Sequence, residues 1–147
     1  MRLSLFPDVN VWLALTHDRH VHHPAAARWL ASQDDEPIFF CRFTQLGLLR
    51  LLTNQQVMGV DVMGQRQAWL AYRRWFDDDR VEFHREPESP EFEGLFEQLS
   101  RKALPSTKRW ADAYLGAFAK SAGLTLVTFD QAFGRMLPGA ASVLALP

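Results

Sequence analysis

The amino-acid sequence predicts an α/β fold in which helices flank a central, mostly parallel β-sheet. Short apolar runs alternate along the chain with longer stretches that have the apolar spacing of amphipathic helices. Strands that are separated by helices in this way usually connect in parallel. Of the 147 residues, 48% are apolar and 22% are charged, which is enough to build a substantial core. We therefore expect residues 1–147 to form one domain.

The first third of the chain is expected to contain two strands and three helices. Pro7 and Asp8 end the first apolar run, and Asp8 then lies next to the N-terminus of the first helix. Thr44 is expected to be the N-cap of the third helix, in which leucine dominates the apolar positions. In chain order, these elements are a strand at 3–6, a helix at 9–15, a helix at 22–33, a strand at 37–41 and a helix at 45–53.

The rest of the chain repeats this alternation after a connecting stretch at 54–63. An acidic run at 77–79 ends the next amphipathic stretch, and Gly123 is expected to be the C-terminal cap of the longest helix. Asp130 opens a short turn or helix after the fourth strand. In chain order, the main elements are a helix at 64–77, a strand at 80–84, helices at 92–99 and 110–122, and strands at 124–129 and 142–146.

Composition excludes several classes of protein. The formal net charge of −1 leaves no generally basic surface, so nucleic-acid binding would require a local patch. Cys41 is the only cysteine, which excludes an internal disulfide and a cysteine-based zinc site. The apolar N-terminal run is broken by Pro7, Asp8 and Asn10, unlike a signal peptide, and no run is long enough to span a bilayer. We therefore expect a cytoplasmic protein without a membrane partner.

Three aspartates are expected to meet at one edge of the sheet. Asp8 directly follows the first strand and Asp130 the fourth, and the carboxyl ends of parallel strands share an edge. Asp112 is expected in the first turn of the helix at 110–122, whose N-terminus points toward that edge. Grouped carboxylates repel one another unless a cation lies between them, and Mg²⁺ or Mn²⁺ prefers such oxygen ligands. Each aspartate taken alone is equally compatible with a helix N-cap.

Four motifs stand out along the chain: FPDVNVWLAL at 6–15, TQLGLLRLLTN at 44–54, WADAYLGAFA at 110–119 and LVTFDQAF at 126–133. Together they resemble the motifs of PIN-domain ribonucleases, and most closely those of VapC-type toxins from type II toxin–antitoxin pairs. The resemblance implies a three-layer PIN-like fold and a Mg²⁺- or Mn²⁺-dependent endoribonuclease that hydrolyses RNA phosphodiesters with a metal-activated water. It also implies inhibition by a small cognate antitoxin.

The resemblance also assigns roles to individual residues. Asp8, Asp112 and Asp130 occupy the positions of metal-site residues in the matching motifs. Asn10 would orient Asp8 or a metal-bound water, and Thr128 would be a supporting hydroxyl just before Asp130.

One position departs from the family pattern. Related chains place a glutamate three residues before the arginine of the second motif, and here Gly47 precedes Arg50 at that distance. Gln45 would be a weak, neutral substitute, and an acid from the loop at 33–36 is a further alternative. The sequence therefore predicts a site with one charge fewer than the family pattern.

Basic and apolar residues suggest where partners bind. Arg42, Arg50, Lys108 and Arg109 flank the acidic motifs and are expected to hold RNA phosphates. A salt bridge is an equally good interpretation of Arg50, and Trp110 is expected either to stack on a base or to be buried. The helices at 45–53 and 64–77 have wide apolar faces that belong to the core or, in part, to a homodimer or antitoxin surface.

Four histidines, His17, His20, His22 and His23, crowd into one short segment. A zinc site is one interpretation, but a solvated loop leading into the next helix is favoured, because the aspartates already account for metal binding.

Two alternative functions stay open. An aspartate after the first strand is also the nucleophile of haloacid-dehalogenase-type phosphatases, but those enzymes usually have a second aspartate two positions later, where this chain has Asn10. The other alternative is a non-catalytic PIN-like binding protein, because Gly47 replaces an expected acid.

Overall fold

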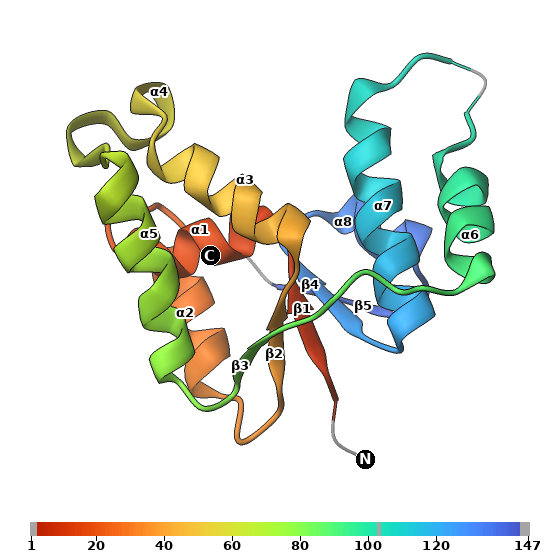
Figure 1. Ribbon diagram of the computed structural model, residues 1–147, viewed down its shortest axis with the longest axis horizontal. Coiled ribbons are helices and arrows are strands. Elements are labelled where there is room, and N and C mark those ends of the chain that lie inside the picture. Colours follow the sequence, from red (N-terminus) through yellow and green to blue (C-terminus); the bar gives the residue numbers. More distant parts are fainter. Residues whose placement is uncertain (1–2, 103, 145–147) are drawn as a thin grey trace.

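The computed structural model describes residues 3–102 and 104–144, and its centre is one β-sheet (Figure 1). Within these residues the sheet has five strands in the order β3-β2-β1-β4-β5, and every neighbouring pair is parallel. The predicted α/β fold with a mostly parallel sheet is therefore confirmed. The strands are β1 (Leu5–Pro7), β2 (Ile38–Phe40), β3 (Val81–Phe83), β4 (Thr125–Thr128) and β5 (Ala141–Val143). The end of the strand expected at 142–146 lies outside the described residues.

Helices cover both faces of the sheet, so the described part of the chain has three layers (Figure 1). One layer contains α1, α2, α3 and α5, and the other contains α6, α7 and α8. The helices are α1 (Val9–Thr16), α2 (His23–Ala31), α3 (Arg42–Leu52), α4 (Gln55–Met58), α5 (Gln65–Arg74), α6 (Pro90–Ser100), α7 (Thr107–Ala122) and α8 (Gln131–Met136), with short 3-10 helices η1 (Gly59–Asp61) and η2 (Trp75–Asp77). No helix in the described residues is long and apolar enough to cross a membrane.

The two layers follow from the alternation of side chains along each strand. Leu5 belongs to the core on the α1 side, whereas the next residue, Phe6, belongs to the core on the α7 side. Val127 and Leu126 of β4 divide in the same way. Because both faces of β1 and β4 are buried, these two strands form the rigid centre of the molecule, and the residues that directly follow them are fixed in position.

The starts of several helices differ from the sequence prediction, most clearly those of α3, α4 and α7. Cys41, not Thr44, is the N-cap of α3; Thr44 lies in the first turn and its hydroxyl accepts a hydrogen bond from the Cys41 N–H at 2.9 Å. The stretch expected to be a plain connection contains α4, which Asn54 caps by accepting from the Gln56 N–H. Helix α7 begins at Thr107 rather than at residue 110. The sequence prediction missed its first residues because they are polar and show no apolar periodicity.

Candidate metal centre

Asp8 is held at the carboxyl end of β1 by hydrogen bonds that join its N–H and its carboxylate to three other residues. Its N–H donates to the Val127 carbonyl of the neighbouring strand at 2.9 Å. One carboxylate oxygen caps α1 by accepting from the Val11 N–H at 3.0 Å, and the other accepts from the Thr128 hydroxyl at 2.5 Å. The residue is only 5% exposed. Asp8 is therefore both an N-cap and a buried carboxylate at the predicted edge of the sheet.

Thr128 connects Asp8 with Asp130. Its fully buried hydroxyl donates to Asp8 and accepts from the Asp130 N–H at 3.0 Å. One carboxylate oxygen of Asp130 caps α8 by accepting from the Ala132 N–H at 2.8 Å, which leaves the other oxygen for the site. The N-cap and metal-site interpretations of these two aspartates are thus compatible, because capping uses one oxygen of each.

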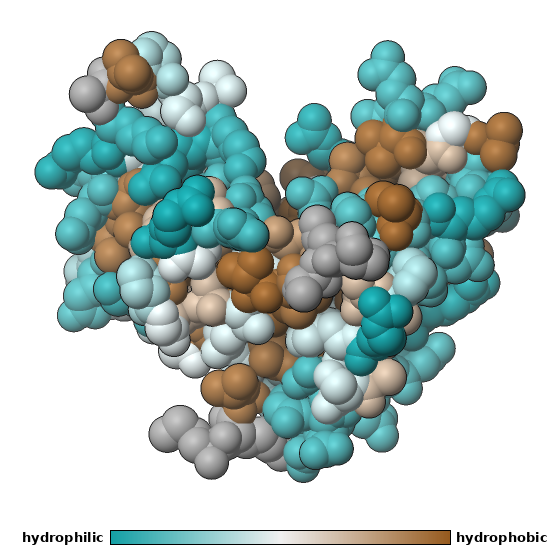
Figure 2. Space-filling view, turned by 180° about the vertical axis from the view of Figure 1, so that it is seen from behind, coloured by the Kyte–Doolittle hydropathy of each residue, from teal (hydrophilic) through white to brown (hydrophobic). Residues whose placement is uncertain are grey.

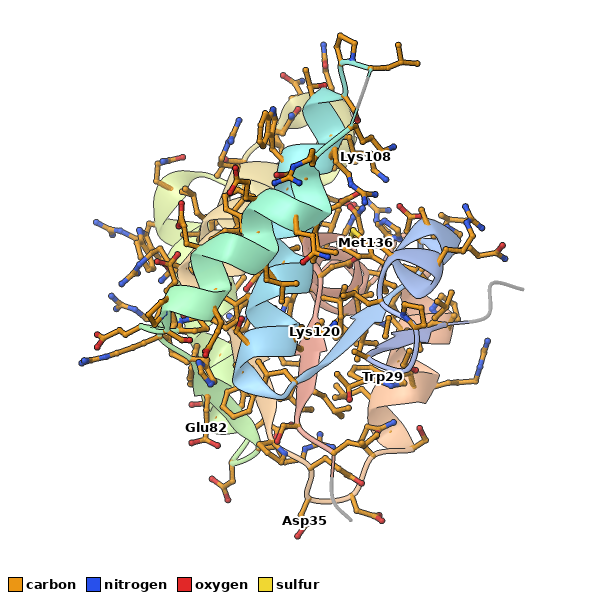
Figure 3. The ribbon with its side chains drawn as sticks, turned by 90° about the vertical axis from the view of Figure 1, so that its right-hand side faces the viewer. Trp29, Asp35, Glu82, Lys108, Lys120 and Met136 are labelled. Carbon is orange, nitrogen blue, oxygen red and sulfur yellow. The ribbon has the colours of Figure 1, made fainter. Side chains whose placement is uncertain are left out.

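Lys108 brings Asp112 and Asp130 together. Its ammonium lies 3.2 Å from Oδ2 of Asp112, one helical turn away on α7, and 2.6 Å from Oδ2 of Asp130. Figure 3 shows Lys108 at the upper end of α7, near the edge of the sheet. Asp112 is in the second turn of α7, not in the first as expected, because the helix begins three residues earlier. Two carboxylates from different elements therefore converge on a single cation.

The charges at this edge affect one another. Burial raises the pKa of Asp8 to about 6; the hydrogen bonds from Thr128 and Val11 oppose this shift, and the charges of Asp112 and Asp130 add to it. The Lys108 ammonium holds the pKa of Asp130 below its ordinary value, and Asp130 in turn raises the pKa of Lys108. The site therefore has an excess of negative charge that one lysine only partly offsets.

The stability of the metal-free protein is expected to depend on the protonation of Asp8. Because the pKa of Asp8 rises from 3.8 to about 6 on folding, the folded state holds a proton that the unfolded state releases. The free energy of unfolding should fall as the pH rises from about 4 to about 6, by on the order of 2 kcal/mol, and then level off. Urea unfolding in EDTA, compared with Asp8→Asn, isolates this contribution. Equal pH dependence of the two proteins in this range would contradict it.

The donor atoms at this edge fit a hard divalent cation. All of them are carboxylate oxygens, the ligands that Mg²⁺ and Mn²⁺ prefer. Within the described residues, no three acidic, histidine or cysteine side chains are grouped closely enough to hold a metal ion as they stand. Mg²⁺ is often held by only two carboxylates together with waters and substrate phosphate, and Asp112 and Asp130 already share one cation. Asp8 is the third carboxylate, electrostatically coupled to both.

Two hollows open onto the carboxylates, and Asp8, Asn10 and Asp130 line both of them. The smaller hollow, of about 160 Å³, also contains Lys108 and Asp112. The larger one, of about 390 Å³, is closed by the segment that follows α1 and by Phe129. Seen from behind, the space-filling surface is hollowed between the two helical layers above the sheet (Figure 2). A chain-like substrate could therefore extend to both sides of the carboxylates.

Position 47 is a close contact between α3 and α1. A Cβ atom added to Gly47 would lie 2.6 Å from Cγ2 and 3.0 Å from Cγ1 of Val9, a residue that also lines the smaller hollow. Gln45 is buried, and its amide oxygen accepts from Arg42 at 2.6 Å. The loop at 33–36 precedes β2 and lies at the opposite end of the sheet; Figure 3 shows Asp35 at that end, far from Lys108. None of these positions adds an acid to the site.

The predicted RNA-contacting residues are spread over several surfaces. Only Lys108 lies among the carboxylates. Arg42 lies over the Phe83 ring beside an adjacent hollow, and Arg50 borders the groove between α3 and α5. The Arg109 guanidinium donates to the Leu99 carbonyl at 2.7 Å and so ties α7 to α6. Trp110 is 61% exposed, so it is not the buried aromatic that was one of its two interpretations.

The four histidines do not form a metal cluster. His17 pairs with Asp61 at 3.0 Å, and the His23 ring bonds to the Ala14 carbonyl at 2.7 Å, so these two side chains are engaged elsewhere. His20 and His22 instead line the larger hollow beside Asp8 and Asp130. The sequence did not assign these two residues to the site; the only signal was their position directly after the helix that Asp8 begins.

Comparisons with known proteins agree with this architecture. A family model described as the PIN domain matches residues 5–136. The chain is 42% identical over 134 residues to the ribonuclease VapC41 of Mycobacterium tuberculosis, covering 88% of this chain and 90% of that protein. The fold is similar to that of M. tuberculosis VapC20, described as a sarcin–ricin loop cleaving toxin, with a TM-score of 0.69, 21% identity and coverage of 97% and 100%. It is also similar to a chain of VapBC2 from Rickettsia felis, crystallised with a promoter DNA fragment, with a TM-score of 0.65, 14% identity and coverage of 97% and 100%.

Proposed function

The chain belongs to the PIN-domain family, and we propose that it is a divalent-metal-dependent endoribonuclease, the toxin of a toxin–antitoxin pair. The single observation that carries the catalytic part is the convergence of Asp112 and Asp130 on one cation beside the buried Asp8. Identity of 42% to a ribonuclease over most of the chain supports the substrate class. The cation that this site would hold during the reaction is Mg²⁺ or Mn²⁺.

Each side chain of the site has a distinct part in RNA cleavage. Asp8, Asp112 and Asp130 would hold the metal, and Thr128 fixes Asp8 and Asp130 relative to each other through its two hydrogen bonds. A bound Mg²⁺ or Mn²⁺ supplies charge that polarises a phosphoryl oxygen and acidifies water. Asn10 lies between the two hollows, where its amide can orient a water or a ribose hydroxyl. Lys108 leaves the carboxylates and offsets the charge of the RNA phosphate.

The residue two positions after Asp8 weighs against the phosphatase alternative. Phosphatases of that type usually have a second aspartate there, whereas in this chain Asn10 lines both hollows beside Asp8. A non-catalytic role is also disfavoured, because Asp112, which caps no helix, adds repulsive charge beside the two capping aspartates Asp8 and Asp130.

The proposed partners are RNA, a small antitoxin and a second copy of this chain. Exposed apolar side chains on α3 and α5, including Leu46, Trp69 and Leu70, are 54%, 42% and 51% exposed. Apolar surface of this kind supports a protein partner on the α3–α5 side.

Lys108→Met is expected to strengthen metal binding in the absence of RNA. The substitution removes the cation that competes for Asp112 and Asp130 while keeping a similar side-chain length. Titration calorimetry with Mn²⁺ should show a dissociation constant lower by about tenfold. Lys120→Met, on the exposed last turn of the same helix, is the matched control and should leave it unchanged (Figure 3). Weaker Mn²⁺ binding by Lys108→Met would mean that this lysine supports the metal rather than competing with it.

The activity itself is tested by incubating the purified chain with a set of defined RNA transcripts. We expect cleavage with Mg²⁺ or Mn²⁺, loss of cleavage in EDTA, and recovery after excess metal is added back. Cleavage that continues in EDTA would rule out the metal mechanism, and intact transcripts in the presence of Mn²⁺ would rule out the proposed activity.

A further inference from the structure

Two histidines line the larger hollow beside the carboxylates, and neither has a part in the mechanism above. His20, Val21, His22 and Phe129 line this hollow together with Asp8, Asn10 and Asp130. Its volume of about 390 Å³ is large enough for a planar ring system. We name it the histidine pocket. It directly adjoins the position at which a phosphate would be cleaved.

The wall of the histidine pocket is held in place at several points. The His22 N–H donates to Nδ1 of His20 at 3.0 Å, and the His22 ring packs on Phe129 with 5.2 Å between ring centroids. The flanking residues anchor the segment, because His17 pairs with Asp61 and His23 bonds to the Ala14 carbonyl. The aromatic surface beside Asp8 and Asp130 is therefore built into the fold and not a chance arrangement of a free loop.

His20 presents a neutral hydrogen-bonding group to the pocket. Since Nδ1 of His20 accepts a hydrogen bond, its neutral ring carries the proton on Nε2, which is then a donor. Burial, together with the charges of His22, His17 and His23, lowers the pKa of His20 and so favours this neutral form. Nδ1 of His22 is buried and has no hydrogen-bond partner within the described residues. A neutral donor beside an aromatic ring suits a nucleobase, whereas a phosphate would require cations.

We propose that the histidine pocket binds the base of the nucleotide adjacent to the cleaved phosphate, and that it contributes to the choice of cleavage site. This inference rests on the proposed RNA-cleaving function. Phe129 and His22 supply the aromatic surface for stacking, and His20 supplies a hydrogen-bond donor to the base edge. Stacking of one base on an aromatic side chain changes affinity by about tenfold.

Binding is tested without cleavage, by nuclear magnetic resonance in EDTA. The four nucleoside 5′-monophosphates are titrated while the imidazole signals of His20 and His22 are followed, with His84 as the internal reference because it lies outside this pocket. We expect saturable shifts of His20 and His22 with at least one nucleotide and little change at His84. Absence of shifts, or equal shifts of all three histidines, would overturn the proposal.

Specificity is tested by sequencing the cleavage products of a random RNA pool. The wild type should prefer certain bases next to the cut, and His22→Ala should reduce that preference by about tenfold while cleavage continues. His84→Ala is the matched control. Phe129→Leu keeps the apolar volume and removes the stacking ring, so it gives the answer if His22→Ala does not fold.

An unchanged preference in folded variants would overturn the pocket assignment but not the ribonuclease. Absence of cleavage by the wild type would overturn the proposed function, while the nucleotide titration would still decide on the pocket.

Discussion

Asp112→Asn is expected to reduce kcat/KM for RNA cleavage by at least about a hundredfold, or roughly 3 kcal/mol of transition-state stabilisation. The substitution removes one of the two carboxylates that converge on the Lys108 ammonium, and an amide oxygen is a much weaker ligand for a divalent cation. The fold should be unaffected, because Asp112 caps no helix and its ion-pair partner Lys108 is 68% exposed. Steady-state cleavage of a fluorescent RNA, with thermal unfolding in parallel, measures both effects.

Two comparisons make this result specific. Asp79→Asn makes the same chemical change at an exposed acid outside the site and should leave both activity and stability unchanged. Asp8→Ala is a poorer test. It would remove the cap of α1 and leave the Thr128 hydroxyl without its acceptor, at a cost of about 1–2 kcal/mol. If Asp112→Asn cleaves RNA at the wild-type rate, Asp112 is not part of the site.

Gly47→Glu is expected to destabilise the protein and not to improve metal binding. From the sequence, this substitution would restore a missing acid. In the structure, its Cβ would lie 2.6 Å from a γ-carbon of Val9, and a β-branched side chain in a helix has little freedom to move away. Overpacking of this kind costs about 2–3 kcal/mol, or roughly a 10 °C fall in Tm. Thermal unfolding and Mn²⁺ calorimetry measure the two effects.

The steric origin of this effect can be separated from the change of residue type. Gly94→Glu is the matched control, because nothing lies within 4 Å of a Cβ at this helical position, and its stability should change by less than about 1 kcal/mol. Val9→Ala removes both contacting γ-carbons, so it should rescue a large part of the loss when combined with Gly47→Glu. Tighter Mn²⁺ binding by a stable Gly47→Glu protein would contradict the assignment of position 47 to helix packing.

Much of the fold could be predicted because it depends on local patterns. Short apolar or alternating runs between helices predicted the five strands of the described sheet, and Gly123, with a positive φ of 69°, ends α7 as expected. The positions of Asp8 and Asp130 followed from the same reasoning, because each residue comes just after a strand of a parallel sheet.

The remaining features depend on contacts between distant segments, which have no local signal. The Lys108–Asp130 pair joins residues 22 positions apart, and it forms only because α7 begins earlier than its apolar pattern suggests. The contact between Gly47 and Val9 depends on how α3 crosses α1. The histidine pocket likewise requires the segment after α1 to return beside Phe129. Family motifs indicate which residues belong to the site, but not which contacts and pockets form between those residues in the folded chain.

The central claim is that Asp8, Asp112 and Asp130 together hold the catalytic metal. Anomalous diffraction from crystals grown with Mn²⁺ tests it most directly, because the signal locates the ion without reference to activity. We predict a single strong peak between these three carboxylates, with the Lys108 ammonium displaced from its position between Asp112 and Asp130. A peak at any other group of residues, or Lys108 still bridging the two aspartates at saturating Mn²⁺, would contradict the account.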